Sequence, residues 1–349
     1  IDSGYIEAPR RFFSFCHAVI TDEGYLLHKY NADGSLASSW HGWYHDGQKE
    51  LPIQEDETAL VLWALWRHYQ RFRDVEYIKP LFRGLIVRAA NWMLSYRDPE
   101  TGLPLPSWDL WEERRGVFAW TVGATWGGLQ AAANFAEAFG EDNLAQQYRQ
   151  ACAAMQSATE RLFWDDAEQC YARMVRLQDD GAVERDMTAE SSLFGLCYFG
   201  MIAPDAPRMR ATMLRMRERL SVQTQIGGIA RYQHDQYYRV RDDAQVPGNP
   251  WFICTLWLAQ WYIEMAHEQA DLVQALGLLH WATDHALASG VMGEQVHPYT
   301  GESLSVSPLT WSHATFVLVV HEYLDRLRAC RKKPKDSAED APGSDLCID

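Results

Sequence analysis

Two kinds of helical segment alternate along this 349-residue chain, and the alternation restricts the possible fold more than any other feature. One kind is amphipathic: Leu144, Tyr148, Cys152 and Met155 form an apolar stripe with charged residues opposite it. The other kind is apolar nearly all round, as in PWFICTLWLAQWYIEM, and such a helix must be buried on every side. The pattern predicts inner apolar helices wrapped by outer amphipathic ones. Helices are predicted at 5–18, 55–72, 76–98, 117–139, 142–162, 188–200, 206–220, 250–267, 270–288 and 308–328, alternately outer and inner.

The links between these helices also alternate in length. A few residues follow each inner helix, whereas a loop of about 15 residues or more follows each outer helix. A ring of inner helices explains this difference, because all the long loops then gather at the N-terminal ends of the inner helices. The sequence therefore predicts an all-α fold, an (α/α)6 toroid. A complete toroid has twelve helices and this chain has ten candidates, so we expect one outer and one inner helix to lie upstream of Ile1.

The charge and the aromatic content restrict the class of partner. A formal net charge of -15 and a pI near 5.2 argue against nucleic acid and anionic membranes as partners. Charged residues interrupt every apolar stretch before about 18 residues, so no transmembrane helix is expected. The chain contains 15 Trp and 16 Tyr, and aromatic faces rimmed by carboxylates suit sugars. The alternative is that these residues merely fill a large core.

Cysteine and histidine give no sign of disulfides or metal. The seven cysteines are odd in number and include no CxxC pair, which favours free thiols in a reducing, cytoplasmic compartment. Because the sequence begins at Ile1, a signal peptide would lie outside it. The twelve histidines form no HExxH motif or cluster, so no metal or cofactor is expected. The sequence leaves the oligomeric state open.

The long loops carry the candidate catalytic residues. SWDLWEERR places Glu112 and Glu113 side by side near Trp108 and Trp111. By itself this pair also fits an exposed acidic turn that caps the next helix. Desolvation by tryptophan and the charge of a neighbouring carboxylate both favour a protonated Glu112, which suits a general acid. Glu294 follows in the last long loop, and together the two carboxylates fit the pair that hydrolyses a glycosidic bond.

Aromatic residues lie in or at the ends of the same loops. We expect at least part of each ring to face one pocket, where the rings would form a platform for a sugar. These residues are Trp43, Trp108, Trp111, Tyr232 and Trp251.

Five motifs make the sequence resemble a known family. WDLWEE, GGIARY, GNPWF, GEQ and LTWSHA occur in the order and approximate spacing of glucoamylases and related glycoside hydrolases of family 15, particularly the bacterial members. The resemblance covers residues 5–328. It implies an (α/α)6 barrel and net inversion at the anomeric carbon. Residues 1–330 are then a catalytic domain that is incomplete at its N-terminus, and the polar tail 331–349 is expected to be disordered.

The resemblance also implies roles for single residues. Glu112 matches the general acid, Glu113 its sugar-binding neighbour, and Glu294 the general base that activates water. Asp109 and Trp111 match sugar contacts of the acid loop. Arg231 matches the arginine that binds substrate hydroxyls. The family's Trp-Pro-Arg-Asp type motif does not occur in this sequence, and its expected place is upstream of the first helix.

We therefore expect an inverting, exo-acting α-glucoside hydrolase whose substrate is an oligosaccharide or α-glucan. Two alternatives stay open: a phosphorylase on a similar toroid, and a catalytically silent sugar-binding or regulatory domain. Glu294 argues against the first alternative, because a phosphate site favours basic or hydroxyl groups. A silent domain would have no chemical need for Glu112 and Glu294. The linkage, whether α-1,4, α-1,6 or trehalose-type, is left open by the sequence.

Overall fold

The computed structural model describes residues 1–39, 42–51, 53–178, 181–241 and 245–332 of the chain. Every predicted helical range contains helix. The helices are α1 (Glu7–Val19), α2 (Glu55–Phe72), α3 (Val75–Leu81), π-helix η1 (Phe82–Val87), α4 (Arg88–Ser95), α5 (Ala119–Ala138), α6 (Asp142–Leu162), 3-10 helix η2 (Ser191–Phe194), α7 (Gly195–Tyr198), α8 (Pro207–Leu220), α9 (Phe252–Met265), 3-10 helix η3 (Gln269–Leu272), α10 (Val273–Asp284) and α11 (Thr310–Lys332).

The third predicted helix is divided into three parts. Pro80 lies inside α3, and the π-helical segment η1 begins two residues later, at Phe82. A proline lacks the backbone N–H and its ring clashes with the carbonyl four residues earlier, so the regular ladder is locally interrupted. The helix then continues as α4.

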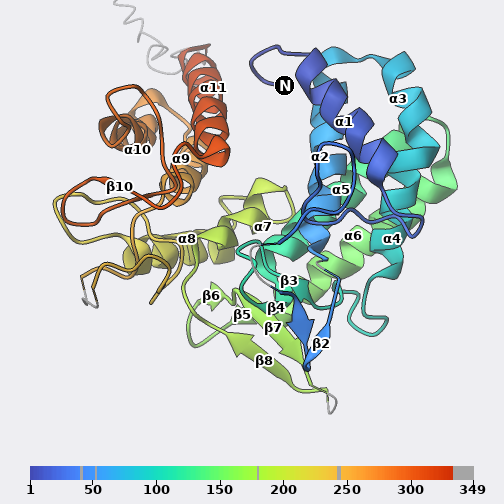
Figure 1. Cartoon of the computed structure of the whole chain (residues 1–349), viewed down its shortest axis with the longest axis horizontal. Helices are drawn as coiled ribbons and strands as arrows, with labels where there is room; N and C mark the ends of the chain where they lie inside the picture. Colours follow the sequence, from blue (N-terminus) through green and yellow to red (C-terminus); the bar gives the residue numbers. More distant parts are fainter. Residues whose placement is uncertain (40–41, 52, 179–180, 242–244, 333–349) are drawn as a thin grey trace, which may run out of the picture.

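The helices form the predicted inner and outer layers. Successive inner helices contact one another: α2 packs on α5, α5 on α7, and α9 on both η2 and α11. The outer helix α6 buries one stripe, which includes Ala145, Tyr148, Cys152 and Met155. In Figure 1 the chain follows an arc that begins at α1 and ends at α11.

The two ends of this arc approach each other. The hydroxyl of Ser3, just before α1, lies 3.0 Å from Nε2 of His321 on α11. Trp311, Val317 and Leu324 on α11 are 37 %, 46 % and 38 % exposed, although the sequence predicts this helix to be an inner one. The expectation that upstream residues complete the ring stays a prediction.

Short strands occupy parts of the long loops. They are β1 (Tyr44–His45), β2 (Gln48–Lys49), β3 (Ser107–Trp108), β4 (Arg115–Phe118), β5 (Trp164–Asp165), β6 (Cys170–Tyr171), β7 (Met174–Leu177), β8 (Val183–Asp186), β9 (Gln295–Val296) and β10 (Ser303–Leu304). One antiparallel sheet has the order β3-β4-β7-β8, with Trp108 opposite Arg115 and Met174 opposite Asp186. Residues 109–114 form the tip between β3 and β4, so this sheet supports the loop that carries Glu112 and Glu113.

Hydrogen bonds join the residues that precede the first inner helices. The amide of Trp108, before α5, donates to the carbonyl of Ile53, before α2, over 3.2 Å. The side-chain amide of Gln54 donates to the carbonyl of Asp109 over 2.7 Å. From the same loop, Trp111 Nε1 donates to Glu190 Oε1 over 2.9 Å, and Glu190 immediately precedes η2.

The connection continues to the last inner helices. Glu190 forms a β-bridge with Tyr232, and Trp251, before α9, forms one with Gln295. The amide of Phe252 donates to the carbonyl of Glu294 over 3.3 Å. These contacts confirm that the long loops gather at the N-terminal ends of the inner helices.

Three further expectations concern the chain as a whole. No helix among the described residues is both long and apolar enough to span a membrane. The six cysteines in the described ranges are free thiols. The expected disordered tail lies outside the described residues, except for Arg331 and Lys332, which are the last two residues of α11.

Candidate active site

The loop between β3 and β4 is a tight turn fixed by Asp109. Its Oδ1 accepts the backbone amides of Glu113 over 2.7 Å and of Arg114 over 3.0 Å. The amide of Glu112 donates to the carbonyl of Asp109 over 2.9 Å. Glu112 has a φ of 59°, in the left-handed region, which costs a non-glycine residue about 1–3 kcal/mol. The contacts of Asp109 therefore hold the candidate acid in an unfavourable backbone conformation.

Asp109 itself is 1 % exposed. Burial raises the pKa of its carboxyl group to about 7, and the amide hydrogen bond from Arg114 acts in the opposite direction. This burial favours a bracing role for Asp109, and its direct contact with a sugar stays a prediction.

Glu113 is held by two residues of the GGIARY motif. Arg231 Nη2 donates to Glu113 Oε1 over 2.6 Å, and the Tyr232 hydroxyl donates to Oε2 over 2.6 Å. Arg231 is 3 % exposed and also donates through Nε and Nη2 to the two carboxylate oxygens of Asp235, each over 2.8 Å. The Glu113 side chain keeps 29 % exposure, so one of the adjacent acids is paired yet still reaches the surface.

Glu112 borders a cavity of about 420 Å³ between the inner helices. Among the described residues, four tryptophans line this central cavity, and each comes from a different inner helix: Trp63 on α2, Trp120 on α5, Trp257 on α9 and Trp311 on α11. The sequence gives no sign of their position, since a helix that is apolar all round does not reveal which side faces a cavity.

The aromatic residues expected to form an open platform are placed differently. None of these five residues is among the described residues that line the central cavity. Trp43, Trp111, Tyr232 and Trp251 are 3–8 % exposed, and Trp108 is half-buried. The expected platform is therefore corrected: Trp43 packs against Trp108, and Trp111 packs against Trp251 and against Trp257 and Trp311 of the inner helices. A direct contact of any of them with a sugar stays a prediction.

Trp111 belongs to the layer behind the cavity wall. Its ring centroid lies 5.6 Å from that of Trp251, 6.0 Å from that of Trp257 and 6.1 Å from that of Trp311. The guanidinium carbon of Arg231 lies 5.1 Å from the centroid of Trp111, a cation–π distance. Trp111 thus connects the cavity to the pair formed by Arg231 and Glu113.

A buried ion network that the sequence analysis missed fixes Trp111. Glu190 accepts Trp111 Nε1 with Oε1 and Arg173 Nη1 with Oε2, over 2.9 Å and 3.1 Å. Arg173 also donates to Asp186 Oδ2 over 2.7 Å, and its side chain is 6 % exposed. A single sequence carries no signal for such a pairing, because Arg173 and Glu190 belong to no recognisable motif.

Glu294 is anchored by its backbone at the start of α9. Its amide donates to the carbonyl of Val306 over 2.9 Å, and its carbonyl accepts the amide of Phe252. Gln295 Nε2 lies 3.3 Å from Glu294 Oε2, and Asn249 Nδ2 donates to Gln295 Oε1 over 2.9 Å. The GNPWF and GEQ motifs therefore form one hydrogen-bonded unit around Glu294.

Tyr237 packs on Arg231, and its hydroxyl group is affected by the charge of Glu294. Burial raises the pKa of the Tyr237 hydroxyl, and the charge of Glu294 contributes to this shift. The ring of Tyr237 lies 5.2 Å from the guanidinium carbon of Arg231, which binds Glu113. Tyr237 thus lies beside the arginine that binds Glu113, and the charge of Glu294 acts on its hydroxyl group.

A second acidic group, also missed, begins α2. Asp56 and Glu57 line the central cavity, and burial raises the pKa of Asp56 to about 6 and that of Glu57 well above its ordinary value. Asp56 Oδ2 accepts Trp120 Nε1 over 3.0 Å. The N-terminus of a helix stabilises negative charge, which partly offsets the cost of burying these acids.

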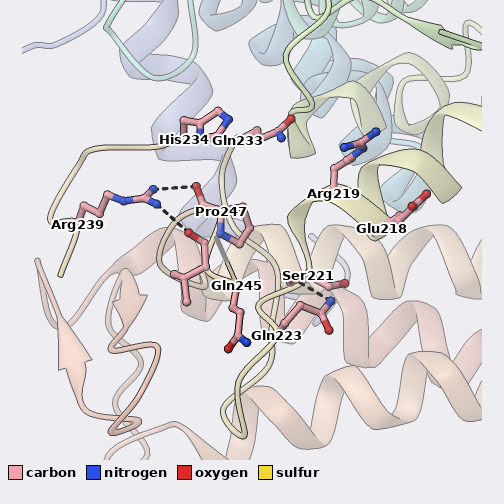
Figure 2. Close-up of a pocket in the computed structure, with 10 residues that line it drawn as sticks. Glu218, Arg219, Ser221, Gln223, Gln233, His234, Arg239, Gln245 and Pro247 are labelled. Atoms are coloured by element: carbon pink, nitrogen blue, oxygen red, sulfur yellow. Dashed lines mark hydrogen bonds between the residues drawn. The ribbon is translucent and has the colours of Figure 1, made fainter. Parts of the chain in front are cut away.

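A cavity of about 560 Å³ lies outside this site, between the end of α8 and the loop that follows it (Figure 2). Arg239 Nη1 donates there to the carbonyl of Pro247 over 3.1 Å, and Nη2 to that of Val246 over 2.9 Å. Among the described residues that line it, Glu218 is the one carboxylate and no tryptophan occurs. We therefore assign the candidate active site to the central cavity.

Two known proteins are similar to most of this chain. An uncharacterized glycosyl hydrolase of Methanocaldococcus jannaschii is 30 % identical over 330 residues, which are 91 % of this chain and 48 % of that protein. A glucoamylase of Clostridium sp. is 24 % identical over 353 residues, 93 % of this chain and 46 % of that protein. This chain thus spans about half the length of these relatives.

A solved structure shows the same fold. It is a bacterial glucoamylase complexed with acarbose, with a TM-score of 0.71 and 21 % identity, and the match covers 90 % of this chain and 46 % of that one. This likeness confirms the predicted (α/α)6 toroid. The sequence model of glycosyl hydrolases family 15 matches residues 44–321, most of the chain. The chain therefore belongs to glycosyl hydrolases family 15.

Proposed function

We propose that this chain carries the catalytic centre of an inverting, exo-acting α-glucoside hydrolase that releases glucose from α-glucans or oligosaccharides. One observation carries the proposal. Of two adjacent carboxylates on a braced turn, Glu113 is bound to Arg231 and Tyr232, whereas Glu112 borders the central cavity. Such a separation gives one acid a binding role and leaves the other for proton transfer.

The reaction follows from these positions. Glu112 gives its proton to the glycosidic oxygen as the bond from that oxygen to the anomeric carbon breaks. Glu294 takes a proton from a water molecule, whose oxygen attacks the anomeric carbon from the opposite face. The configuration inverts, and the two carboxyl groups are expected to lie roughly 6.5 to 9.5 Å apart.

Substrate binding is assigned to neighbouring groups. Glu113 accepts hydrogen bonds from sugar hydroxyls, and Arg231 donates hydrogen bonds to them, because both carry polar atoms at the turn beside Glu112. The tryptophans of the central cavity supply apolar faces for the C–H faces of the sugar rings. Asp109, Trp43, Trp108, Trp111 and Trp251 shape this site.

Proton NMR of the first product tests the proposal. The gene product that contains this chain is incubated with maltose, isomaltose, trehalose, dextran and starch, with and without phosphate. We expect β-glucose to appear first from at least one of them. α-Glucose as the first product from starch or dextran would contradict inversion, whereas an inverting enzyme releases one α-glucose and one β-glucose from trehalose. Glucose 1-phosphate would indicate a phosphorylase, and sugar binding without turnover would indicate a silent domain.

A further inference from the structure

A buried histidine faces the candidate acid from a loop that carries no recognised motif. His28 lies between α1 and α2, and its side chain is 2 % exposed. Its Nδ1 is 3.7 Å from Glu112 Oε1. This distance is too long for a hydrogen bond, yet it is within the range of direct electrostatic interaction.

The other nitrogen of the ring is held by a hydroxyl group. His28 Nε2 lies 2.6 Å from Ser39 Oγ, and Ser39 Oγ accepts a hydrogen bond from Trp43 Nε1. An indole N–H can only donate, so the proton of the Ser39 hydroxyl is available for Nε2. A neutral imidazole that accepts at Nε2 carries its proton on Nδ1, the nitrogen that faces Glu112.

Aromatic packing fixes the orientation of this ring. The centroid of Trp43 lies 4.9 Å from that of His28 with an interplanar angle of 63°, and 4.8 Å from that of Trp108 at 88°. Trp108 is part of β3, the strand that leads into the turn of Glu112. The imidazole and the turn are therefore positioned by the same aromatic group.

Burial favours the neutral form of the other described titratable groups that line a cavity beside His28. His28 lines a cavity of about 400 Å³ together with Cys16 on α1, Tyr30 and Glu57. Burial raises the pKa of Cys16 to about 12 and raises that of Tyr30. Burial and the charges of Asp56 and Glu112 raise the pKa of Glu57, which favours its neutral form. Glu112 is thus the carboxylate on which His28 acts.

We propose that His28 is a positioning residue for Glu112: the imidazole, whose Nδ1 side faces the carboxyl group at 3.7 Å, orients Glu112 toward the leaving group and stabilises electrostatically the carboxylate that remains after proton transfer. The inference rests on the proposed role of Glu112 as general acid. His28 neither gains nor loses a proton in the step, because the transferred proton moves from Glu112 to the glycosidic oxygen.

Two substitutions at His28 test this role. His28→Leu removes the donor, whereas His28→Asn keeps an N–H group near the place of Nδ1. We expect His28→Leu to lower kcat/KM on maltose about 10- to 100-fold, part of the factor that a general acid supplies. Activity on α-glucosyl fluoride should change little, because fluoride leaves with little protonation. His28→Asn should restore most of the loss.

The pH profile gives a second readout. Without the donor, Glu112 should stay protonated to higher pH, so the alkaline limb of kcat on maltose should move upward in His28→Leu and return in His28→Asn. The matched control is His45→Leu, since that ring is 50 % exposed. The proposal would be overturned if His28→Leu lost the same activity on maltose and on α-glucosyl fluoride and left the alkaline limb of the pH profile unchanged. Glu112→Gln is assayed in parallel, and an equal loss on both substrates in that variant would instead contradict the proposed function.

Discussion

Arg231 Nη2 and Glu113 Oε1 are 2.6 Å apart, and this contact joins the acid loop to the loop before α9. Because Arg231 also binds Asp235 and is buried, its charge is balanced by two carboxylates in an apolar environment. In the proposed mechanism this pair gives the two neighbouring glutamates different functions, since Arg231 binds Glu113.

Arg231→Met should destabilise the protein. The substitution leaves Glu113 and Asp235 without their shared cation, and removing one partner of a buried ion pair costs about 3–5 kcal/mol. Glu113→Gln should lower the free energy of unfolding by less, because Arg231 keeps its ion pair with Asp235. Urea denaturation measures both. Arg326→Met is the control, since its pair with Glu264 is largely exposed and should contribute less than about 1 kcal/mol. Equal effects at the two arginines would contradict this account.

Trp311→Ala should weaken sugar binding more than it weakens folding. The ring lines the central cavity and is 37 % exposed, so little core packing is lost. We expect KM for maltose to rise about tenfold, which corresponds to about 1.4 kcal/mol of binding free energy. Trp281→Ala on the outer helix α10 is the comparison, because this ring packs against His285 and Phe252. An unchanged KM in Trp311→Ala would remove this ring from the binding site.

Stability should fall as the pH rises from about 4 to about 7. Burial raises the pKa of Asp109 to about 7 and that of Glu322 to about 7. In the unfolded chain such groups lose their protons near pH 4, so above that pH the unfolded state binds fewer protons than the folded one. The free energy of unfolding then decreases with pH until the folded groups also ionise.

Glu322→Gln and Asp109→Asn should each flatten this dependence, because an amide does not titrate. Urea denaturation between pH 4 and pH 8 measures the slope, with Asp325→Asn as the control at a side chain that is 74 % exposed. If the slope of both variants equals that of the unchanged protein, these two carboxyl groups are ionised in the fold throughout the range.

The architecture could be predicted from the sequence because its signals are long. Ten helical ranges and the alternation of loop lengths extend over the whole chain, and both follow directly from burial. The sheet around the acid loop was missed because β3 and β7 have two and four residues, too few for a period of two to stand out.

Sequence motifs contain Glu112, Glu113, Arg231 and Glu294, and the catalytic and binding roles expected for these residues stay predictions. The structure joins the loops of Glu113 and Arg231 by an ion pair, and those of Asn249 and Gln295 by a hydrogen bond. His28 lies in a loop without a motif, and its importance depends on a contact across 84 positions of the sequence. Such contacts arise because the loops before the neighbouring inner helices α2 and α5 lie together, which local patterns do not encode.

The most direct test of the central assignment compares two substitutions on two substrates. Glu112→Gln should reduce hydrolysis of maltose or isomaltose by at least about 100-fold, the lower range of general acid catalysis, yet spare α-glucosyl fluoride. Glu294→Gln should damage both reactions, because water must be activated whichever group departs. For each variant, the initial rate on each substrate is divided by that of the unchanged protein. A selective loss in Glu112→Gln alone is the predicted result, and equal losses on both substrates in that variant would contradict its role as the general acid.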